Sequence, residues 1–308
     1  MKNLLFIFFL IFSSPINTSF AGSAFPGPLI SADWLVNNVD DIVILDTRKD
    51  LESFTKEGHI ENAVLVDVKK IRVNREIEGK KITRMRPDAA GFQVFMREHG
   101  VSNSSQVVIT HRGKSSGQVA GAARLYWHMK YYGFENVALL DGGNAAWLTA
   151  LEDLVKETNK VEKGNYITGK EHPEILATMQ QVQKSLDESS TTLIDTRALR
   201  YHIGIDKKSY VFEYGHIPGA KSLPYKLLNP LKGNAVFYEK DKLKTIIDLL
   251  QIDMKNNLIM FCNSAYECSS VWFVLHEILG NKDVRIYDGS LHQWTQYEEN
   301  PMTRELTR

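Results

Sequence analysis

The chain has 308 residues, of which 43% are hydrophobic and 24% are charged, as in an ordinary globular protein. Its 37 basic residues are balanced by 37 acidic residues, so the net charge gives no argument for binding nucleic acid. Two cysteines, Cys262 and Cys268, cannot supply a disulfide framework, and at roughly 100–200 residues per domain the length predicts two domains with hydrophobic cores.

The first 21 residues have the pattern of a secretory signal peptide. Lys2 gives a positive start, residues 4–12 are apolar, and Ser19 and Ala21 are small residues where a signal peptidase requires them. The apolar core is too short to span a bilayer, and an uncleaved anchor is the alternative. We expect residues 1–21 to be cleaved and the mature protein to be exported, in a bacterium to the periplasm, with no membrane attachment.

The next segment, residues 22–150, alternates predicted helices and strands. We expect helices at 29–38, where Ser31 is a suitable N-cap, at 89–98, and in a long stretch that ends at 131. Strands are expected at 41–45, at 106–110 and at 137–140, with a turn and a strand within 57–66. The alternation predicts an α/β domain with a mainly parallel sheet.

Residues 69–86 of this segment carry eight basic side chains. They could form a positive rim that attracts anions. Such a run more often forms a solvated surface loop, and this is the interpretation that we favour.

Residues 151–174 are charged and break the pattern, which predicts a linker, and the landmarks of the first half then return in residues 175–308. The sequence LIDTR at 193–197 repeats ILDTR at 44–48, and GHIPGA at 215–220 repeats GHIENA at 58–63. YDG at 287–289, followed by Trp294, repeats LDG at 140–142, followed by Trp147. The same order at a nearly constant offset predicts a duplicated domain.

The second half contains the strongest candidate for a reactive residue, Cys262. It directly follows the apolar residues 258–261, which read as a buried strand, and precedes a short loop and a helix expected at 269–279. Ligands of open α/β sheets bind at this end of the strands. Loop amides and a helix N-terminus favour a negative charge there, so the thiol should ionise easily and act as a nucleophile. A buried structural cysteine is the alternative.

These landmarks together resemble a rhodanese domain, and the first half resembles a second, degenerate copy. The residues that carry the resemblance are Asp195, Thr196 and Arg197, then Arg200 and Tyr201, residues 215–220, Cys262, residues 287–289 and Trp294. The resemblance implies two tandem α/β domains, each with a central five-stranded, mainly parallel sheet flanked by helices. It also implies a sulfurtransferase of the thiosulfate or 3-mercaptopyruvate type, with a persulfide on Cys262.

The first copy departs from the family pattern where the chemistry would occur. His111 stands where the second copy has Cys262, and histidine cannot carry a sulfane sulfur, so this domain is expected to be catalytically silent. The residues His111, Arg112 and Lys114 could form an anion site. A surface loop without functional constraint is the interpretation that we favour.

The loop of the second copy is expected to bind substrate through Asn263, Ser264, Ala265, Tyr266 and Glu267. It contains no cation, whereas thiosulfate-using members of the family usually have basic residues there. A small neutral loop resembles the mercaptopyruvate-using members, but Glu267 fits neither type. Arg200 matches the arginine that contacts the anionic substrate in such enzymes, and a surface salt bridge is its alternative role.

The expected reaction starts with attack of the Cys262 thiolate on a sulfane sulfur, and a second nucleophile then takes the outer sulfur in ping-pong kinetics. The partners would be a small anionic donor and a thiol or cyanide acceptor, which could also be a protein thiol. No cofactor is expected, because neither metal-ligand spacing nor a Gly-rich phosphate loop is present. Asp195 and Arg197 read as a structural ion pair.

Three alternatives concern the same loop. A cysteine phosphatase would need an arginine at the sixth position after its nucleophile, and that position is Cys268. A sulfur carrier loaded by a partner protein, with little free turnover, is the non-enzymatic alternative. Cys268 itself is either a buried structural residue, which we favour, or a resolving thiol that forms a disulfide with Cys262.

Overall fold

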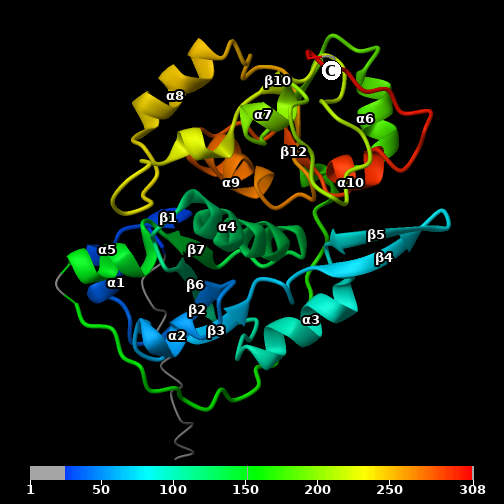
Figure 1. The fold of residues 1–308 in the computed structure, drawn as a ribbon. Coiled ribbons are helices and arrows are strands. Elements are labelled where there is room, and N and C mark those ends of the chain that lie inside the picture. The colour runs from blue at the N-terminus through cyan, green and yellow to red at the C-terminus, as the bar shows by residue number, and fades with distance from the viewer. Residues whose placement is uncertain (1–24, 151, 307–308) are drawn as a thin grey trace, which may run out of the picture.

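The computed structural model describes residues 25–150 and 152–306, so the expected signal peptide, residues 1–21, lies outside the described residues. The chain folds as two α/β domains in sequence, with the N-terminal domain below the C-terminal domain in Figure 1. No helix in the described part of the chain combines the length and the hydrophobicity needed to cross a bilayer.

The N-terminal domain is built on a five-stranded sheet in the order β1-β7-β6-β2-β3, in which all neighbours are parallel. Its strands are β1 (Leu29–Ile30), β2 (Ile42–Arg48), β3 (Val64–Asp67), β6 (Gln106–His111) and β7 (Val137–Leu140). Its helices are α1 (Ala32–Val36), α2 (Ser53–Lys56), α3 (Ala89–Glu98), α4 (Ser116–Tyr131) and α5 (Gly143–Thr149). Ser31 caps α1 as expected, since its hydroxyl accepts a hydrogen bond from the Trp34 amide at 3.2 Å.

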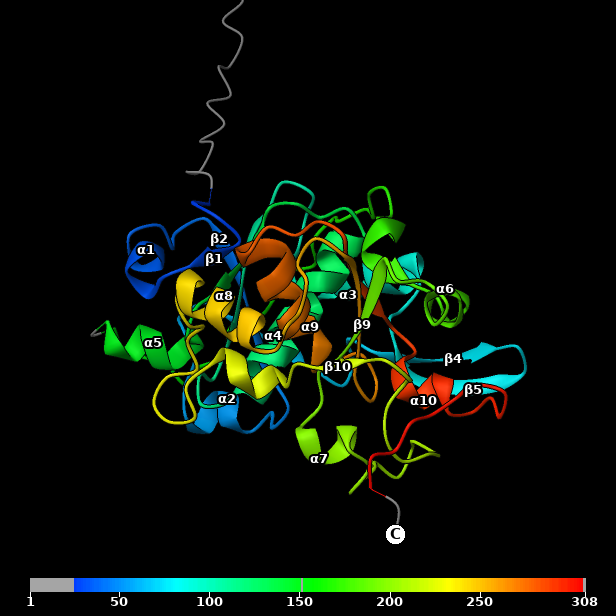
Figure 2. The same cartoon turned by 90° about the horizontal axis from the view of Figure 1, so that it is seen from above.

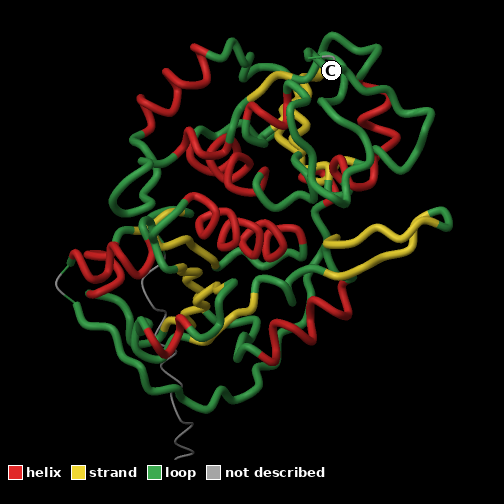
Figure 3. The backbone as a smooth tube through the Cα atoms, in the orientation of Figure 1, coloured by secondary structure: helices red, strands yellow, loops and turns green. Residues whose placement is uncertain are grey.

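The C-terminal domain repeats this sheet in the order β8-β12-β11-β9-β10, again with parallel neighbours only. Its strands are β8 (Leu176–Ala177), β9 (Thr191–Asp195), β10 (Lys221–Ser222), β11 (Asn257–Phe261) and β12 (Val284–Tyr287). Its helices are α6 (Met179–Ser185), α7 (Leu199–His202), α8 (Lys240–Leu249), α9 (Cys268–Trp272) and α10 (Ser290–Trp294), with short 3-10 helices η1 (Pro173–Ile175) and η2 (Tyr225–Leu228). The prediction of two tandem α/β domains, each with a five-stranded parallel sheet and flanking helices, is confirmed (Figure 3).

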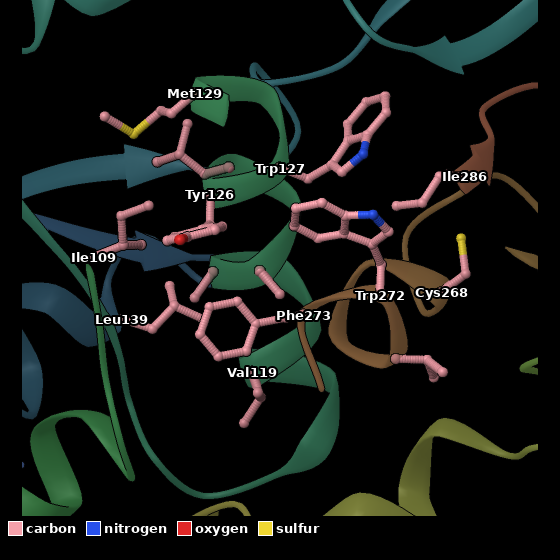
Figure 4. Packing of buried hydrophobic residues seen from close by; sticks show 14 of the residues in the cluster. Ile109, Val119, Tyr126, Trp127, Met129, Leu139, Cys268, Trp272, Phe273 and Ile286 are labelled. Atoms are coloured by element: carbon pink, nitrogen blue, oxygen red, sulfur yellow. The ribbon is translucent and has the colours of Figure 1, made fainter. Parts of the chain in front are cut away.

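The helix expected at 269–279 starts at Cys268 as α9 and continues from Phe273 to Ile278 as a π-helical segment, η3. Wider turns of this kind are frequent beside functional sites. The segment packs against α4 of the other domain, where the ring of Phe273 meets Tyr126 edge to face at 4.9 Å between centroids. Figure 4 shows this apolar contact, with Trp272 and Phe273 facing Tyr126 and Val119. The two domains therefore share one buried hydrophobic interface.

The basic segment 69–86 is not the solvated surface loop that the sequence favours. It forms an antiparallel hairpin of β4 (Val73–Ile77) and β5 (Lys80–Met85), which lies beside α10 of the C-terminal domain (Figure 2). The hydroxyl of Thr83 lies 3.1 Å from Nε2 of His292, and Lys80 stacks over the ring of Tyr297 at 4.4 Å. These tertiary contacts, which link residues more than 200 positions apart, decide the conformation of the segment.

Each domain contributes one aspartate to the contact between them, at equivalent positions of the repeat. Asp141, after β7, accepts a hydrogen bond from the Phe237 amide at 2.9 Å. Asp288, after β12, accepts one from the Arg86 amide at 2.9 Å and forms a buried ion pair with Arg124 of α4. The domains are thus joined by reciprocal polar contacts beside the apolar interface.

The segment expected to be a linker, residues 151–174, contains no helix or regular strand before η1 in its described part. It follows the surface of the N-terminal domain rather than crossing open solvent. The amide of Val155 donates to His59, that of Tyr166 to Val101, and that of His172 to Tyr131.

We predict that Asp288→Ala destabilises the protein strongly. The substitution leaves Arg124, whose side chain is 0% exposed, as a buried cation without its carboxylate. Removing one partner of such a pair costs about 3–5 kcal/mol in the free energy of unfolding. Urea unfolding followed by tryptophan fluorescence measures this loss. Asp283→Ala, at an exposed position just before β12, is the matched control, and equal stability of the two variants would contradict the prediction.

Candidate active site

The loop after β11 is folded around one serine from the neighbouring turn. The amides of Cys262 and Ala265 both donate to Oγ of Ser290, at 3.2 and 3.0 Å, and this hydroxyl donates to the carbonyl of Tyr287 at 2.9 Å. Ala265 adopts a φ of 51°, in the left-handed region, which turns the chain back toward the strand end. Ser290 therefore fixes the curl of the loop around Cys262.

The curl surrounds the sulfur of Cys262 with hydrogen-bond donors. The thiol is buried, which opposes ionisation, but it accepts hydrogen bonds from the Cys268 thiol and from the amides of Cys268, Ser264 and Glu267. Donors of this kind stabilise the charged form more than burial penalises it, and the pKa of Cys262 falls to about 6. At neutral pH this residue is a thiolate and a competent nucleophile.

Cys268 lies against Cys262 and stays protonated. Burial raises the pKa of its thiol well above the ordinary value, and the hydrogen bond to Cys262 raises it further. Both cysteines are free in this structure. Cys268 is thus a buried neutral donor to the thiolate, a role that neither sequence interpretation of this residue includes.

Cys262 opens onto a cavity of about 850 Å³ between the two domains. The C-terminal domain lines it with Tyr210, Tyr225, Cys262, Asn263, Ser264, Tyr266 and Glu267. The N-terminal domain lines it with Thr47, Arg48, Lys49, Asp50, Val68, Lys69, Arg72, Arg84, Arg112, Ser115, Gly117 and Gln118. Pockets of about 300–1,000 Å³ hold drug-sized ligands, so this cavity can hold more than a small inorganic donor.

Two arginines of the N-terminal domain stand out on the wall of the cavity. Arg72 stacks over the ring of Tyr266 at 4.7 Å, and Arg84 stacks over Tyr210 at 4.0 Å. Neither forms an ion pair with a carboxylate of the described residues. Burial lowers the pKa of Arg72, and the neighbouring cations Arg124 and Arg84 lower it further, whereas Tyr266 and Cys262 raise it. The cavity therefore favours an anionic ligand.

A close approach of the two domains sets the position of Tyr266. Gly121 of α4 faces its hydroxyl, and a Cβ at this glycine would lie only 2.5 Å from that oxygen. The absence of a side chain at Gly121 is therefore what allows the loop tyrosine to lie against the other domain.

Of the loop residues expected to bind substrate, Asn263, Ser264, Tyr266 and Glu267 line the cavity. Ala265 does not line it and is fully buried, with its amide bound to Ser290. Its contribution lies in the backbone conformation of the loop.

The structure does not bring Arg200 to this cavity. The residue lies on the short helix α7, its side chain is 61% exposed, and its guanidinium forms an ion pair with Asp206. Arg200 therefore occupies the surface salt bridge that was its alternative role. The sequence match fixes only its position along the chain, whereas the direction of α7 turns its side chain toward solvent.

The loop of the first copy forms part of the wall opposite Cys262. His111 is buried and neutral, because burial and the nearby Arg48 lower its pKa to about 3. Its Nδ1 accepts a hydrogen bond from the Gly113 amide at 3.0 Å. Arg112 and Lys114 both pair with Glu57. The loop is therefore neither a free anion site nor an unconstrained surface loop.

The repeated ion pairs have the structural role that the sequence suggests. Arg197 binds Asp195 through two hydrogen bonds of 2.8 and 2.6 Å, and it also donates to the Gly215 carbonyl. The pair is buried, and each residue neutralises the charge of the other. Arg48 and Asp46 repeat this arrangement in the first domain.

The sequence interpretation missed Arg72 and Arg84, the tyrosines Tyr210 and Tyr225, and Ser290. The run of basic residues at 69–86 could have indicated the arginines, because a positive rim was one of its two interpretations. The sequence favoured the other, a surface loop. Ser290 directly follows the repeated motif at 287–289. Tyr210 lies in an irregular segment and Tyr225 begins the short 3-10 helix η2, and neither has a distinguishing sequence pattern.

The sequence and the fold were then compared with known proteins. Residues 31–150 and 178–297 each match the family described as "Rhodanese-like domain". The sulfur carrier protein TtuD of Thermus thermophilus is 28% identical over 287 residues, which cover 89% of this chain and 95% of that protein. The 3-mercaptopyruvate sulfurtransferase of Escherichia coli K12 is 27% identical over 286 residues, or 89% of this chain and 96% of that protein.

Solved structures share the fold. The Escherichia coli protein SseA, described among 3-mercaptopyruvate sulfotransferases, has a TM-score of 0.72 at 24% identity, over 86% of this chain and 98% of that one. An anaerobic ergothioneine biosynthesis enzyme from Chlorobium limicola has a TM-score of 0.76 at 22% identity, over 91% of this chain and 71% of that one.

We predict that Cys268→Ala raises the pKa of Cys262. The variant removes a thiol donor to the thiolate, and a hydrogen bond to a charged group is worth about 1.5–3 kcal/mol, or about one to two pH units. The rate of alkylation by iodoacetamide, measured against pH, should rise through about pH 6 in the wild type. In the variant the same rise should occur at higher pH.

Cys268→Ser is the matched control, because its hydroxyl can still donate to the sulfur. Its alkylation profile should stay closer to that of the wild type. Identical profiles for the alanine variant and the wild type would show that Cys268 does not tune the nucleophile.

Proposed function

The chain belongs to the family of rhodanese-like domains, and on this premise we propose that it is a sulfurtransferase that carries a sulfane sulfur on Cys262. The observation that carries the proposal is the thiolate of Cys262 at the base of a cationic cavity between the two domains. The two domains match the family, and the curated relatives named above include a sulfurtransferase and a sulfur carrier.

In the first half of the reaction, the thiolate of Cys262 attacks the sulfane sulfur of the donor. The bond from that sulfur to the rest of the donor breaks, and the leaving group takes the electron pair. The product on the protein is a persulfide. The amides of Ser264, Glu267 and Cys268 surround the reacting sulfur and are in place to stabilise the anionic states.

The donor in this proposal is an anion of the thiosulfate or 3-mercaptopyruvate class. The mercaptopyruvate sulfurtransferase among the relatives acts on such a compound, and Arg72 and Arg84 supply cations that lack a carboxylate partner among the described residues. A donor must be attracted to a site whose nucleophile is itself negative. The arginines offset this repulsion.

The acceptor in the second half is a thiol or cyanide, which attacks the outer sulfur and releases Cys262 as a thiolate. Because its pKa is low, Cys262 is a good leaving group. The similarity to the carrier protein TtuD favours a second candidate, a carrier that passes sulfur to a protein thiol with little free turnover. Loading of Cys262 is common to both functions, and turnover with small acceptors distinguishes them.

We also propose that the reaction takes place outside the cytoplasm, in a bacterium in the periplasm. The support is the signal-like pattern of residues 1–21. Detection of the mature N-terminus at residue 22 in an exported fraction tests this proposal.

We predict that one sulfur atom binds to Cys262 and to no other residue. The protein is incubated with thiosulfate, 3-mercaptopyruvate, polysulfide or a thiosulfonate, and the mass of the intact protein and its peptides is measured. At least one donor should add a single sulfur to the peptide that contains Cys262. Cyanide should then release the sulfur as thiocyanate.

Cys262→Ser is the control for this experiment, since it keeps the size and polarity of the side chain. It should neither gain sulfur nor produce thiocyanate. Turnover by this variant would place the reaction at another residue.

We predict that Arg72→Gln together with Arg84→Gln lowers kcat/KM for anionic donors by roughly 10–150-fold per lost charged contact. The loss should appear mainly in KM, because the arginines bind the donor before reaction. Arg200→Gln is the matched control, since its arginine lies outside the cavity and its kinetics should equal those of the wild type. A loss of kcat/KM in the Arg200→Gln control alone would show that Arg200, rather than Arg72 and Arg84, binds the donor.

A further inference from the structure

Glu267 is the acidic residue of the loop that bears the nucleophile, and it lies on the surface of the reaction cavity. Its backbone amide donates to the sulfur of Cys262, and its side chain lines the cavity beside Tyr225 and Tyr210. Among the described residues its carboxyl has one hydrogen-bond partner, Nδ2 of Asn263 at 3.4 Å, and it forms no ion pair. The carboxyl is therefore free to bind a ligand that reaches Cys262.

The surroundings keep this carboxyl protonated at neutral pH. Burial raises the pKa of Glu267, and the adjacent Cys262 thiolate raises it further, to about 8. Lys208 and Arg197 lower it and Asp195 raises it, but these groups do not overcome the burial. A carboxylic acid beside a thiolate is the pair of charge states that a proton transfer to a leaving group requires.

We propose that Glu267 transfers the proton in both halves of the reaction, and that the site is therefore adapted to donors whose leaving group must be protonated. A thiol of the 3-mercaptopyruvate class is such a donor, because transfer of its sulfur breaks a C–S bond and the carbon must then be protonated. The inference rests on the proposed function, because it assumes that sulfur is transferred through Cys262.

The first half of the reaction balances with Glu267 as the acid. The Cys262 thiolate attacks the thiol sulfur of the donor, an S–S bond forms and the C–S bond breaks. The electron pair goes to the donor carbon, which becomes an enolate. The carboxyl of Glu267 gives its proton to the carbon of this enolate, so that a 2-oxo acid anion leaves and Glu267 becomes a carboxylate beside the Cys262 persulfide.

The second half balances with Glu267 as the base. The carboxylate takes the proton of an acceptor thiol, and the resulting thiolate attacks the outer sulfur of the persulfide. The S–S bond on the protein breaks, and the Cys262 thiolate leaves with the electron pair. The acceptor departs as a persulfide, and Glu267 is again a carboxylic acid, ready for the next donor.

Sulfur transfer from thiosulfate requires no proton from Glu267. When Cys262 attacks its outer sulfur, sulfite leaves as an anion that needs no proton at the moment of bond cleavage. Transfer from thiosulfate to cyanide, which attacks as its anion and passes no proton to the site, should therefore proceed without Glu267. This difference allows a test with two reactions in one variant.

The test compares Glu267→Gln with the wild type in both reactions. Glutamine keeps the length of the side chain and the backbone amide at Cys262 but cannot give or take a proton. With 3-mercaptopyruvate and a thiol acceptor, kcat should fall by about 100-fold, the lower end of general acid–base catalysis. With thiosulfate and cyanide, a reaction that needs no proton from Glu267, the loss in kcat should be much smaller, so the ratio of the two activities should change.

The pH profile gives a second readout that a structural role would not move. With 3-mercaptopyruvate, the wild type should gain activity as Cys262 ionises near pH 6 and lose it as Glu267 ionises near pH 8. The loss at high pH should be absent from Glu267→Gln and retained in Glu267→Asp, which keeps an acid at this position. The alkylation profile of Cys262 should be similar in all three proteins.

The outcomes separate the inference from the function on which it rests. Equal losses in both reactions, or no loss in either, would overturn the role of Glu267 while leaving the sulfurtransferase intact. A wild type that accepts sulfur from thiosulfate but not from 3-mercaptopyruvate would also overturn it. A wild type that accepts sulfur from no donor would reject the proposed function and the inference with it.

Discussion

A thiolate buried at the end of a parallel strand is unstable unless donors surround it, and this constraint shapes the site. Cys262 obtains its donors from three amides of its own loop and from the neutral thiol of Cys268. The loop can present these amides only while Ser290 holds its curl through hydrogen bonds to Cys262 and Ala265. The reactivity of the cysteine is therefore a property of the whole strand–loop–helix unit.

The same unit is completed by the other domain, because the cations of the cavity come from the N-terminal half. Their position depends on the hairpin β4–β5, which contacts the C-terminal domain through Thr83 and His292, and on the bond from the Arg86 amide to Asp288. The buried pair of Asp288 and Arg124 links these contacts to the hydrophobic interface between α4 and α9. The contacts that dock the two domains thus also position the cations of the cavity wall.

The sequence was sufficient to predict the fold and to place Cys262 at a strand end beside the cavity, since both depend on local patterns. Neighbouring residues are enough to recognise three features: the strand and helix periodicity, the repeated DTR and DG landmarks, and the cysteine after β11. The cationic wall of the cavity could not be predicted in this way, because Arg72 and Arg84 are brought to the cavity of Cys262 only by contacts between the domains. For Arg200 the sequence match gave the position along the chain but not the orientation of the side chain, which α7 directs to solvent.

Duplication explains why the first copy can lack a cysteine and still be needed. The equivalent strand end of the first copy carries His111 in place of a thiol, and burial keeps this histidine neutral. The loop that follows supplies Arg112 and Ser115 to the wall of the cavity, and the first turn of α4 supplies Gly117 and Gln118. A single copy could hold a thiolate but would leave it open to solvent, without the arginines that attract an anion. The N-terminal domain therefore encloses Cys262 in a cavity whose wall carries positive charge.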